Sequence, residues 1–181
     1  LWSRYCPVSW PVPQTPAGAW WQPYRTGLSH WWHLPGLFRL TVVTAGVNLV
    51  LGVTMASSAA MVTGVFGQTD HVYALLQTGG AVATVMILLA IARLNFSLTL
   101  MGRWSFGGVL VGGLVTAFGP ALWLYALGFV LVIGFDKMFS VYVRSLRQSI
   151  IPTGDYGKTT GVVIMLNNLS QPAAGLAVGL F

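Results

Sequence analysis

GFDKMFSVYVRSLRQSIIPTGDYGKTTGVVIMLNNLSQPAAG, residues 134–175, is the stretch that decides the expected fold of this chain. It predicts the cytoplasmic end of one membrane helix, a short basic loop, and a second membrane helix that carries buried amides. At 100° per residue, the polar side chains of the first helix fall within an arc of about 120°. One face is therefore polar, and the opposite face suits lipid or neighbouring helices. The polar set is Asp136, Lys137, Ser140, Arg144, Arg147 and Gln148.

Asp136 lies several turns inside the apolar run that precedes the basic loop. An ionised carboxylate at that depth costs roughly 2.5–3.5 kcal/mol on insertion scales, so its presence needs a reason. One explanation is an ion pair with Lys137, Arg144 or Arg147 that holds the end of the helix. The other is a role for the carboxylate in proton coupling or substrate binding. The sequence leaves both open.

The composition predicts an all-α integral membrane protein. The chain is 55% hydrophobic and 7% charged, with a mean hydropathy of +0.73, whereas a soluble domain has about 25% charged residues. A bilayer solvates such an apolar exterior directly. The net charge of +6 does not indicate nucleic acid, because the basic residues lie between apolar runs, where they set membrane orientation. Membrane lipid is the expected partner.

About five apolar runs are long enough to cross a bilayer, which takes about 20 helical residues. Residues 1–36 form a Trp- and Pro-rich segment for which the membrane interface is the expected place, a disordered leader being the alternative. Residues 104–135 lack charge and would make a helix of about 48 Å, too long for one span, so Gly119-Pro120 should break them. The transmembrane domain, 37–181, then has spans at 37–66, 72–92, 98–118, 121–143 and 159–181.

Segments that carry Lys or Arg alternate along the chain with connections that carry neither. They precede the first span and separate the second span from the third and the fourth from the fifth, while the other two connections have none. This positive-inside pattern predicts a multi-pass protein of the cell membrane with the basic segments in the cytoplasm. The charges assigned to cytoplasmic loops are Arg93, Arg103, Arg144, Arg147 and Lys158, with Arg25 and Arg39 before the first span.

Polar side chains on four of the spans are candidates for a substrate pathway or for coupling. Buried amides in membrane helices also serve as contacts between helices, which is the competing explanation. The span at 98–118 differs, because Gly108 and Gly112 stand at GxxxG spacing and favour close helix contact. The candidates are Asp136, Asn48, Gln77, Asn167, Asn168 and Gln171.

No enzyme chemistry is expected. The sequence has no serine, histidine and carboxylate set at membrane depth, and its histidines and Cys6 have no zinc-ligand spacing. Residues 154–159 differ from a phosphate-binding loop, because Pro152 stands where that motif has glycine. Neither a metal nor a cofactor is therefore predicted.

The pattern R-x-x-R-Q-x-x-I-P-x-x-x-x-G-K-x-x-G, residues 144–161, resembles the cytoplasmic loop between helices 10 and 11 of major facilitator superfamily (MFS) transporters. The connection from Arg93 to Arg103 is similar to that family's loop between helices 8 and 9, although Asn95 stands where an acidic residue is expected. The resemblance implies a partial MFS-type helical bundle, helices 7 to 11. It further implies a cavity lined by the first, second, fourth and fifth spans.

The function that the resemblance implies is secondary active transport. We expect proton-coupled efflux of a small organic compound, such as a drug or siderophore, across a bacterial inner membrane. The chain would be incomplete, and its partners would be the small-molecule substrate and the missing N-terminal half. The alternative is a non-transporting membrane scaffold or a degenerate transporter fragment, in which the polar faces serve helix association.

The charge pattern makes a prediction about membrane topology. Cysteines introduced at Thr69 and Thr153, with the single natural Cys6 replaced by serine, should react differently with a membrane-impermeant maleimide in intact cells. Thr69→Cys should label from outside, and Thr153→Cys only after permeabilisation, because the basic connection stays cytoplasmic. Equal labelling of both positions from outside would contradict the topology.

Overall fold

In the computed structural model, which describes residues 21–180, every regular element is a helix. Five helices of this part are long and apolar enough to cross a membrane. The predicted all-α class is confirmed. The elements are α1 Gln22–His33, α2 Leu37–Ala59 continued by the π-helical η2 Ala60–Val65, α3 Asp70–Arg93, α4 Leu98–Phe118, α5 Leu122–Ile150, the short η3 Thr153–Asp155, α6 Tyr156–Asn168 and α7 Ser170–Leu180.

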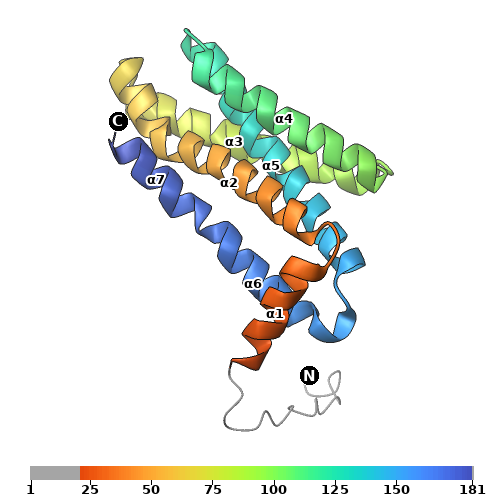
Figure 1. The fold of residues 1–181 in the computed structure, drawn as a ribbon. Coiled ribbons are helices and arrows are strands. Elements are labelled where there is room, and N and C mark those ends of the chain that lie inside the picture. Colours follow the sequence, from red (N-terminus) through yellow and green to blue (C-terminus); the bar gives the residue numbers. More distant parts are fainter. Residues whose placement is uncertain (1–20, 181) are drawn as a thin grey trace, which may run out of the picture.

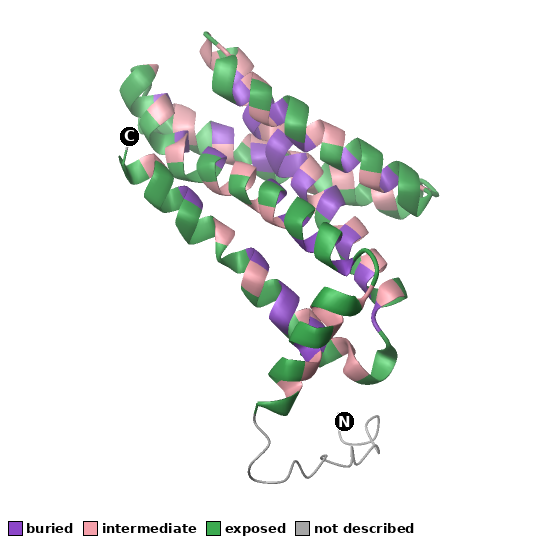
Figure 2. Cartoon of the chain, in the orientation of Figure 1, coloured by how far each residue is buried: buried purple, intermediate pink, exposed green. Residues whose placement is uncertain are grey.

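Helix α5 is the centre of the bundle. Half of its most apolar window is buried, against 11 to 28% in the other four long helices, and the buried residues of Figure 2 concentrate along it. Helices α3 and α4 pack against α5, while α6 and α7 lie along α2 (Figure 1). The polar side of α5 therefore faces a space between α2 and α6.

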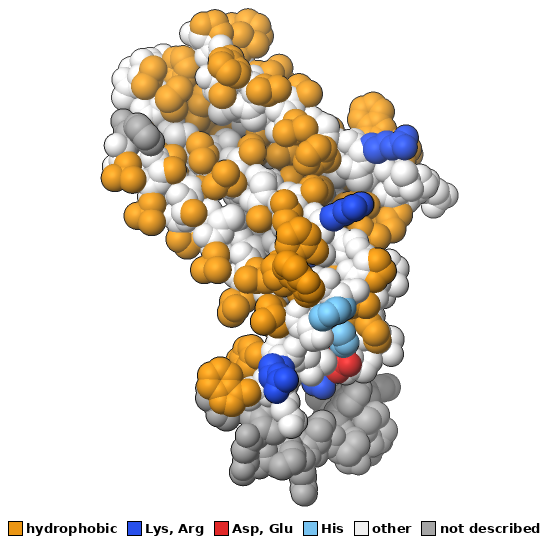
Figure 3. Space-filling view, viewed as in Figure 1, with side chains coloured by type: hydrophobic (Ala, Val, Ile, Leu, Met, Phe, Trp, Pro, Cys, Tyr) orange, Lys and Arg blue, Asp and Glu red, His pale blue; other side chains and the backbone are white. Residues whose placement is uncertain are grey.

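The long helices run back and forth between two ends of the molecule (Figure 1). The start of α2, the α3–α4 connection and the α5–α6 connection lie at one end, and the η2–α3 and α4–α5 connections lie at the other. The basic side chains visible in Figure 3 lie toward the first end, which we call the basic end. This is the arrangement that the charge alternation requires.

Helix α5 extends two turns beyond the expected boundary at residue 143. It ends before Ile151, whose extended backbone (φ −89°, ψ 129°) is the conformation imposed on a residue that precedes proline, here Pro152. Arg144 and Arg147 therefore belong to the helix, and their assignment to a loop was wrong. The other three basic residues assigned to loops also lie in helices, Arg93 at the end of α3, Arg103 in α4 and Lys158 in α6. Arginine is a good helix former, so nothing in the segment stops the helix earlier.

The last expected span, 159–181, begins three residues early and is broken at Leu169. Pro172 explains the break, because it has no N–H to donate to the carbonyl one turn earlier. Near the break, the Ser170 hydroxyl donates to the Asn167 carbonyl over 2.6 Å. Phe181 lies outside the described residues.

The segment 1–36 contains a helix that the sequence reasoning missed. Helix α1 is about 18 Å long, too short to span a membrane, and it packs on α6. At Gly27 a Cβ atom would lie 2.9 Å from the Lys158 carbonyl oxygen. His30 Nδ1 lies 3.0 Å from Thr159 Oγ1. Gly36 then turns the chain into α2 with φ +87°, which glycine adopts without strain. Residues 1–20 lie outside the described part.

Helices α4 and α5 cross at glycines on both partners. A Cβ atom at Gly112 would lie 2.9 Å from the Val132 backbone nitrogen, and one at Gly128 would lie 2.6 Å from that of Thr116. The ring of Phe135 covers Gly108. The close contact expected from the GxxxG spacing is therefore present.

Replacing Gly128 with alanine should destabilise the bundle, because two of the three nearest opposing atoms, Thr116 N and Gly112 O, belong to backbone and cannot move aside. Overpacking of this kind costs about 1–3 kcal/mol. Gly107→Ala is the matched control, since nothing lies within 4 Å of its added Cβ atom, and alanine is favoured over glycine in a helix by up to about 1 kcal/mol.

The measurement is thermal unfolding of the detergent-solubilised chain, followed by circular dichroism. The Gly128 variant should unfold at a lower temperature than the parent and the Gly107 variant at the same or a higher temperature. A rise in both would show that the crossing tolerates a side chain.

Candidate functional site

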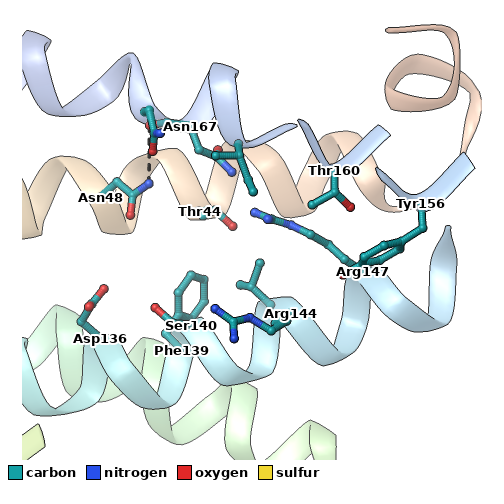
Figure 4. Close-up of a pocket in the computed structure, with 13 residues that line it drawn as sticks. Thr44, Asn48, Asp136, Phe139, Ser140, Arg144, Arg147, Tyr156, Thr160 and Asn167 are labelled. Carbon is teal, nitrogen blue, oxygen red and sulfur yellow. Dashed lines mark hydrogen bonds between the residues drawn. The ribbon is translucent and has the colours of Figure 1, made fainter. Parts of the chain in front are cut away.

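A cavity of about 380 Å³ lies between α2, α5 and α6, toward the basic end (Figure 4). We call it the α2–α5–α6 cavity. Its lining combines charged, amide and hydroxyl groups with a few apolar side chains. The lining residues are Thr44 and Asn48 of α2; Asp136, Phe139, Ser140, Val143, Arg144 and Arg147 of α5; and Tyr156, Thr160, Ile164, Asn167 and Asn168 of α6.

Helix α5 brings its charged side chains to the cavity in one row. Asp136, Ser140, Arg144 and Arg147 are spaced by four, four and three residues, which places them on one face of an α-helix. In Figure 4 both arginine side chains extend from the carboxyl end of α5 toward the middle of the cavity, and Asp136 lies at the other end of the row. Positive and negative charge are thus separated along the cavity.

Helix α6 presents a matching row of neutral polar groups. Tyr156, Thr160 and Asn167 are spaced by four and seven residues, one and two helical turns. From α2, the Asn48 Nδ2 group donates to the Asn167 carbonyl oxygen over 3.5 Å (Figure 4). The Thr44 hydroxyl donates to the Leu40 carbonyl over 2.7 Å, so it is already satisfied within its own helix.

Several buried polar atoms of this cavity have no hydrogen-bond partner among the described residues. They are Arg147 Nε, Thr160 Oγ1, and both Asn167 Nδ2 and Asn167 Oδ1. Leaving such a group unpaired costs about 1–3 kcal/mol. In the described part, the others are Trp31 Nε1 and Tyr125 OH, so the unpaired atoms concentrate at one site. These groups are free to bind a ligand.

Asp136 is buried and paired. Its side chain is 6% exposed, and Oδ2 lies 3.0 Å from the Nζ atom of Lys137, which is 44% exposed. The ion pair proposed for the structural explanation therefore forms with Lys137, while neither arginine forms a salt bridge with Asp136 in residues 21–180. The same carboxylate also lines the cavity, so its position fits the functional explanation as well.

Of the six candidate residues, the cavity brings together Asn48, Asp136, Asn167 and Asn168, and it excludes Gln77 and Gln171. Gln77 lies on α3, behind α5, and its Nε2 group donates to the Tyr73 hydroxyl over 2.7 Å. Helix α3 supplies no lining residue, contrary to the expectation for the second span. Gln171 follows the break at Leu169, and its backbone packs beside Gly52 of α2 instead.

Some of the predicted basic residues line the cavity and others do not. Arg144 and Arg147 line the cavity, while Arg93, Arg103 and Lys158 do not. Lys158 pairs with Asp155, Nζ to Oδ1, over 3.0 Å. Two of the five charges assigned to loops therefore belong to the candidate site.

The sequence reasoning missed Tyr156 and Thr160 as site residues and the cavity-facing role of both arginines. A signal was present. Tyr156 and Thr160 continue the helical face of Asn167 toward the N-terminus of α6. Tyr156 was overlooked because the helix was expected to begin at residue 159, whereas it begins at Tyr156. Thr160 lies inside the expected span, on the face of Asn167, but was not chosen as a candidate.

The unpaired amide of Asn167 makes a prediction about stability. Asn167 is 3% exposed, so replacing it with leucine removes two unsatisfied atoms from a buried position. The thermal unfolding midpoint of Asn167→Leu should equal or exceed that of the parent, since unpaired atoms cost about 1–3 kcal/mol. A clear drop would mean that the amide has a structural partner.

Val163→Ala, at a fully buried position on the same helix, is the control for this measurement. It should lower the midpoint, because it removes apolar packing and leaves a void. The two midpoints together show whether Val163 is needed for packing and whether Asn167 is not.

Comparison with models of protein families, with curated proteins and with solved structures gives no match to this chain. The cavity has a buried acid at one end, two arginines at the other, and unpaired donors and acceptors between the helices.

Proposed function

We propose that this chain is part of an MFS-like secondary transporter of the bacterial inner membrane and that the α2–α5–α6 cavity belongs to its substrate pathway. In this proposal the transporter exports a small organic compound, such as a drug or siderophore, in exchange for protons. The cavity would be completed by the N-terminal half of the transporter.

The surface of the helices supports placement in a membrane. Large apolar side chains are widely exposed on the long helices, among them Met86 of α3, Leu114 of α4 and Trp123 of α5, each more than half exposed. Figure 3 shows hydrophobic groups spread over the side of the bundle. Lipid would cover this surface, which water would not solvate at low cost.

The observation that carries the proposal is the set of unpaired polar atoms in the cavity. Polar side chains that only hold helices together pair with one another across the contact. Here Arg147 Nε, Thr160 Oγ1 and the Asn167 amide stay unpaired at buried positions. A cavity of about 380 Å³ also falls within the usual 300–1,000 Å³ range for small-molecule sites. Both facts favour a transporter over a non-transporting scaffold.

The broken helix α6–α7 gives further support. Secondary transporters commonly bind substrate beside interrupted helices, where freed backbone groups are available. The break at Leu169 is two residues from Asn167, and Asn48 already approaches the backbone there. The interruption and the cavity therefore coincide.

Asp136 is the proposed coupling group. Protonation would remove its ion pair with Lys137 and change the net charge of the cavity by one unit. A transporter that binds a proton and its substrate alternately needs such a group at the substrate pathway. Asp136 lies half-way along α5, a position that suits a group reached in turn from each side of the membrane.

Asp136→Asn, made in the complete transporter, tests the coupling role. The substitution keeps size and removes only the charge, so transport driven by a proton gradient should be lost. Exchange of the exported compound down its own gradient should continue in the same proteoliposomes. Asp155→Asn is the matched control, because it breaks a second Asp–Lys pair of equal length in the α5–α6 connection and should change neither mode.

Undiminished driven transport by the Asp136 variant would eliminate the coupling role. A parallel fall of both modes, together with less folded protein, would assign Asp136 to structure alone. Neither result depends on knowing which oxygen carries the proton.

A further inference from the structure

We propose that the α2–α5–α6 cavity binds the carboxylate of an organic anion, with Arg147 as the charged partner and Thr160 and Asn167 as neutral hydrogen-bonding partners. The inference rests on the proposed function, in which this anion is the transported compound. It names the chemical class of that compound. The geometry of the site carries it in three steps.

The first step is the absence of a carboxylate partner for the arginines. The chain has three acidic side chains. Asp155 pairs with Lys158 and Asp136 with Lys137, each over 3.0 Å, and Asp70 begins α3 at the end opposite the basic end. Arg144 and Arg147 are therefore left without an acidic side chain of this chain, so the cavity keeps positive charge at their end.

The second step is the position of Arg147. Arg147 is buried, with 9% of the residue exposed. Its Nε–H group has no hydrogen-bond partner in the described part. A buried guanidinium gains most from a carboxylate, which accepts two parallel hydrogen bonds from it. Thr160 and Asn167 lie across the cavity on α6 (Figure 4), where hydroxyl and amide N–H groups add further donors.

The third step concerns the rest of the ligand. Phe139, Val143 and Ile164 line the same cavity and provide apolar contacts beside the polar groups. This combination suits an anion with an apolar body rather than an inorganic ion. Asp136 lies at the far end of the row (Figure 4), and the lining has no second group of basic side chains there for another carboxylate. The preferred compound therefore carries one anionic group.

Equilibrium binding tests this without any transport. The chain is placed in nanodiscs of phosphatidylcholine, and benzoate and benzamide are titrated as probes that share a ring but differ in charge. Benzoate should bind and benzamide should not. Arg147→Gln should weaken benzoate binding at least about tenfold, since charged hydrogen bonds are the strong ones. Arg93→Gln, the same substitution at an exposed position outside the cavity, should leave the affinity unchanged.

Asn167→Leu supplies a second variant that does not depend on the folding of the Arg147 variant. It should also weaken benzoate binding, because it removes a donor while leaving the charge in place. Equal benzoate affinity in the parent and in either folded cavity variant would overturn the inference. So would equal affinity for benzamide and benzoate.

The phosphate of an anionic lipid shares the chemistry of the proposed ligand, and a second nanodisc separates the two. Replacing phosphatidylcholine with phosphatidylglycerol should leave benzoate affinity unchanged if the site takes a free organic anion. A loss of benzoate binding there, restored by phosphatidylcholine, would assign the site to lipid and overturn the inference. Benzoate binding without any transport by the complete protein would instead contradict the proposed function alone.

Discussion

The close packing of α4 on α5 is the constraint on which the rest of the structure depends. Because Gly112 and Gly128 carry no side chains, the two backbones approach until a Cβ atom at Gly112 would lie 3.0 Å from the Gly128 carbonyl oxygen. Phe135 continues the contact along α5. At 100° per residue, Asp136 and Arg147 lie about a quarter of a turn from this line. Fixing one face of α5 against α4 therefore aims its polar face at α2 and α6.

A second constraint places the partners of that polar face. Pro172 interrupts the last span, and α7 beyond the break packs on α2 at Gly52, where a Cβ atom would lie 2.8 Å from the side chain of Ala174. Helix α6 before the break is held by α1, with Gly27 and His30 at the contact. The two halves of the span are thus tied to different helices. This leaves room between α5 and α6 for the cavity.

Helix packing fixes the polar groups of the cavity at buried positions, but their hydrogen-bonding capacity is not satisfied there. Packing positions Arg147 and Asn167 at buried sites, while the groups that could pair with them belong to other contacts: Asp136 with Lys137, and Asn48 with the Asn167 backbone. Such an arrangement leaves buried polar groups whose loss of hydrogen bonds to water is not compensated within the described residues. In the proposed function, a bound ligand would supply the missing partners.

The sequence by itself determined the helical class, the places of the five long apolar helices and the alternation of basic and uncharged connections. These follow from hydropathy, length and charge, which act locally along the chain. The predicted range 98–118 coincides with α4, because Gly119-Pro120 marks its end. The helical face of Asp136, Ser140 and Arg147 was also visible, since spacing alone defines a face.

Only the tertiary structure decided which faces meet. Gln77 and Asn48 are both amide side chains on predicted spans. Helices α3 and α2 both pack on α5, but only α2 borders the cavity, so only Asn48 reaches it. Arg144 and Arg147 share the helical face of Asp136, but they line a cavity because α6 lies opposite that face. Gln171 shares a face with Asn167 in a continuous helix, but the break at Leu169 separates them. The places of Gln77, Asn48 and the two arginines depend on packing between helices far apart in sequence, which a local pattern does not contain. The break at Leu169 instead follows locally from Pro172.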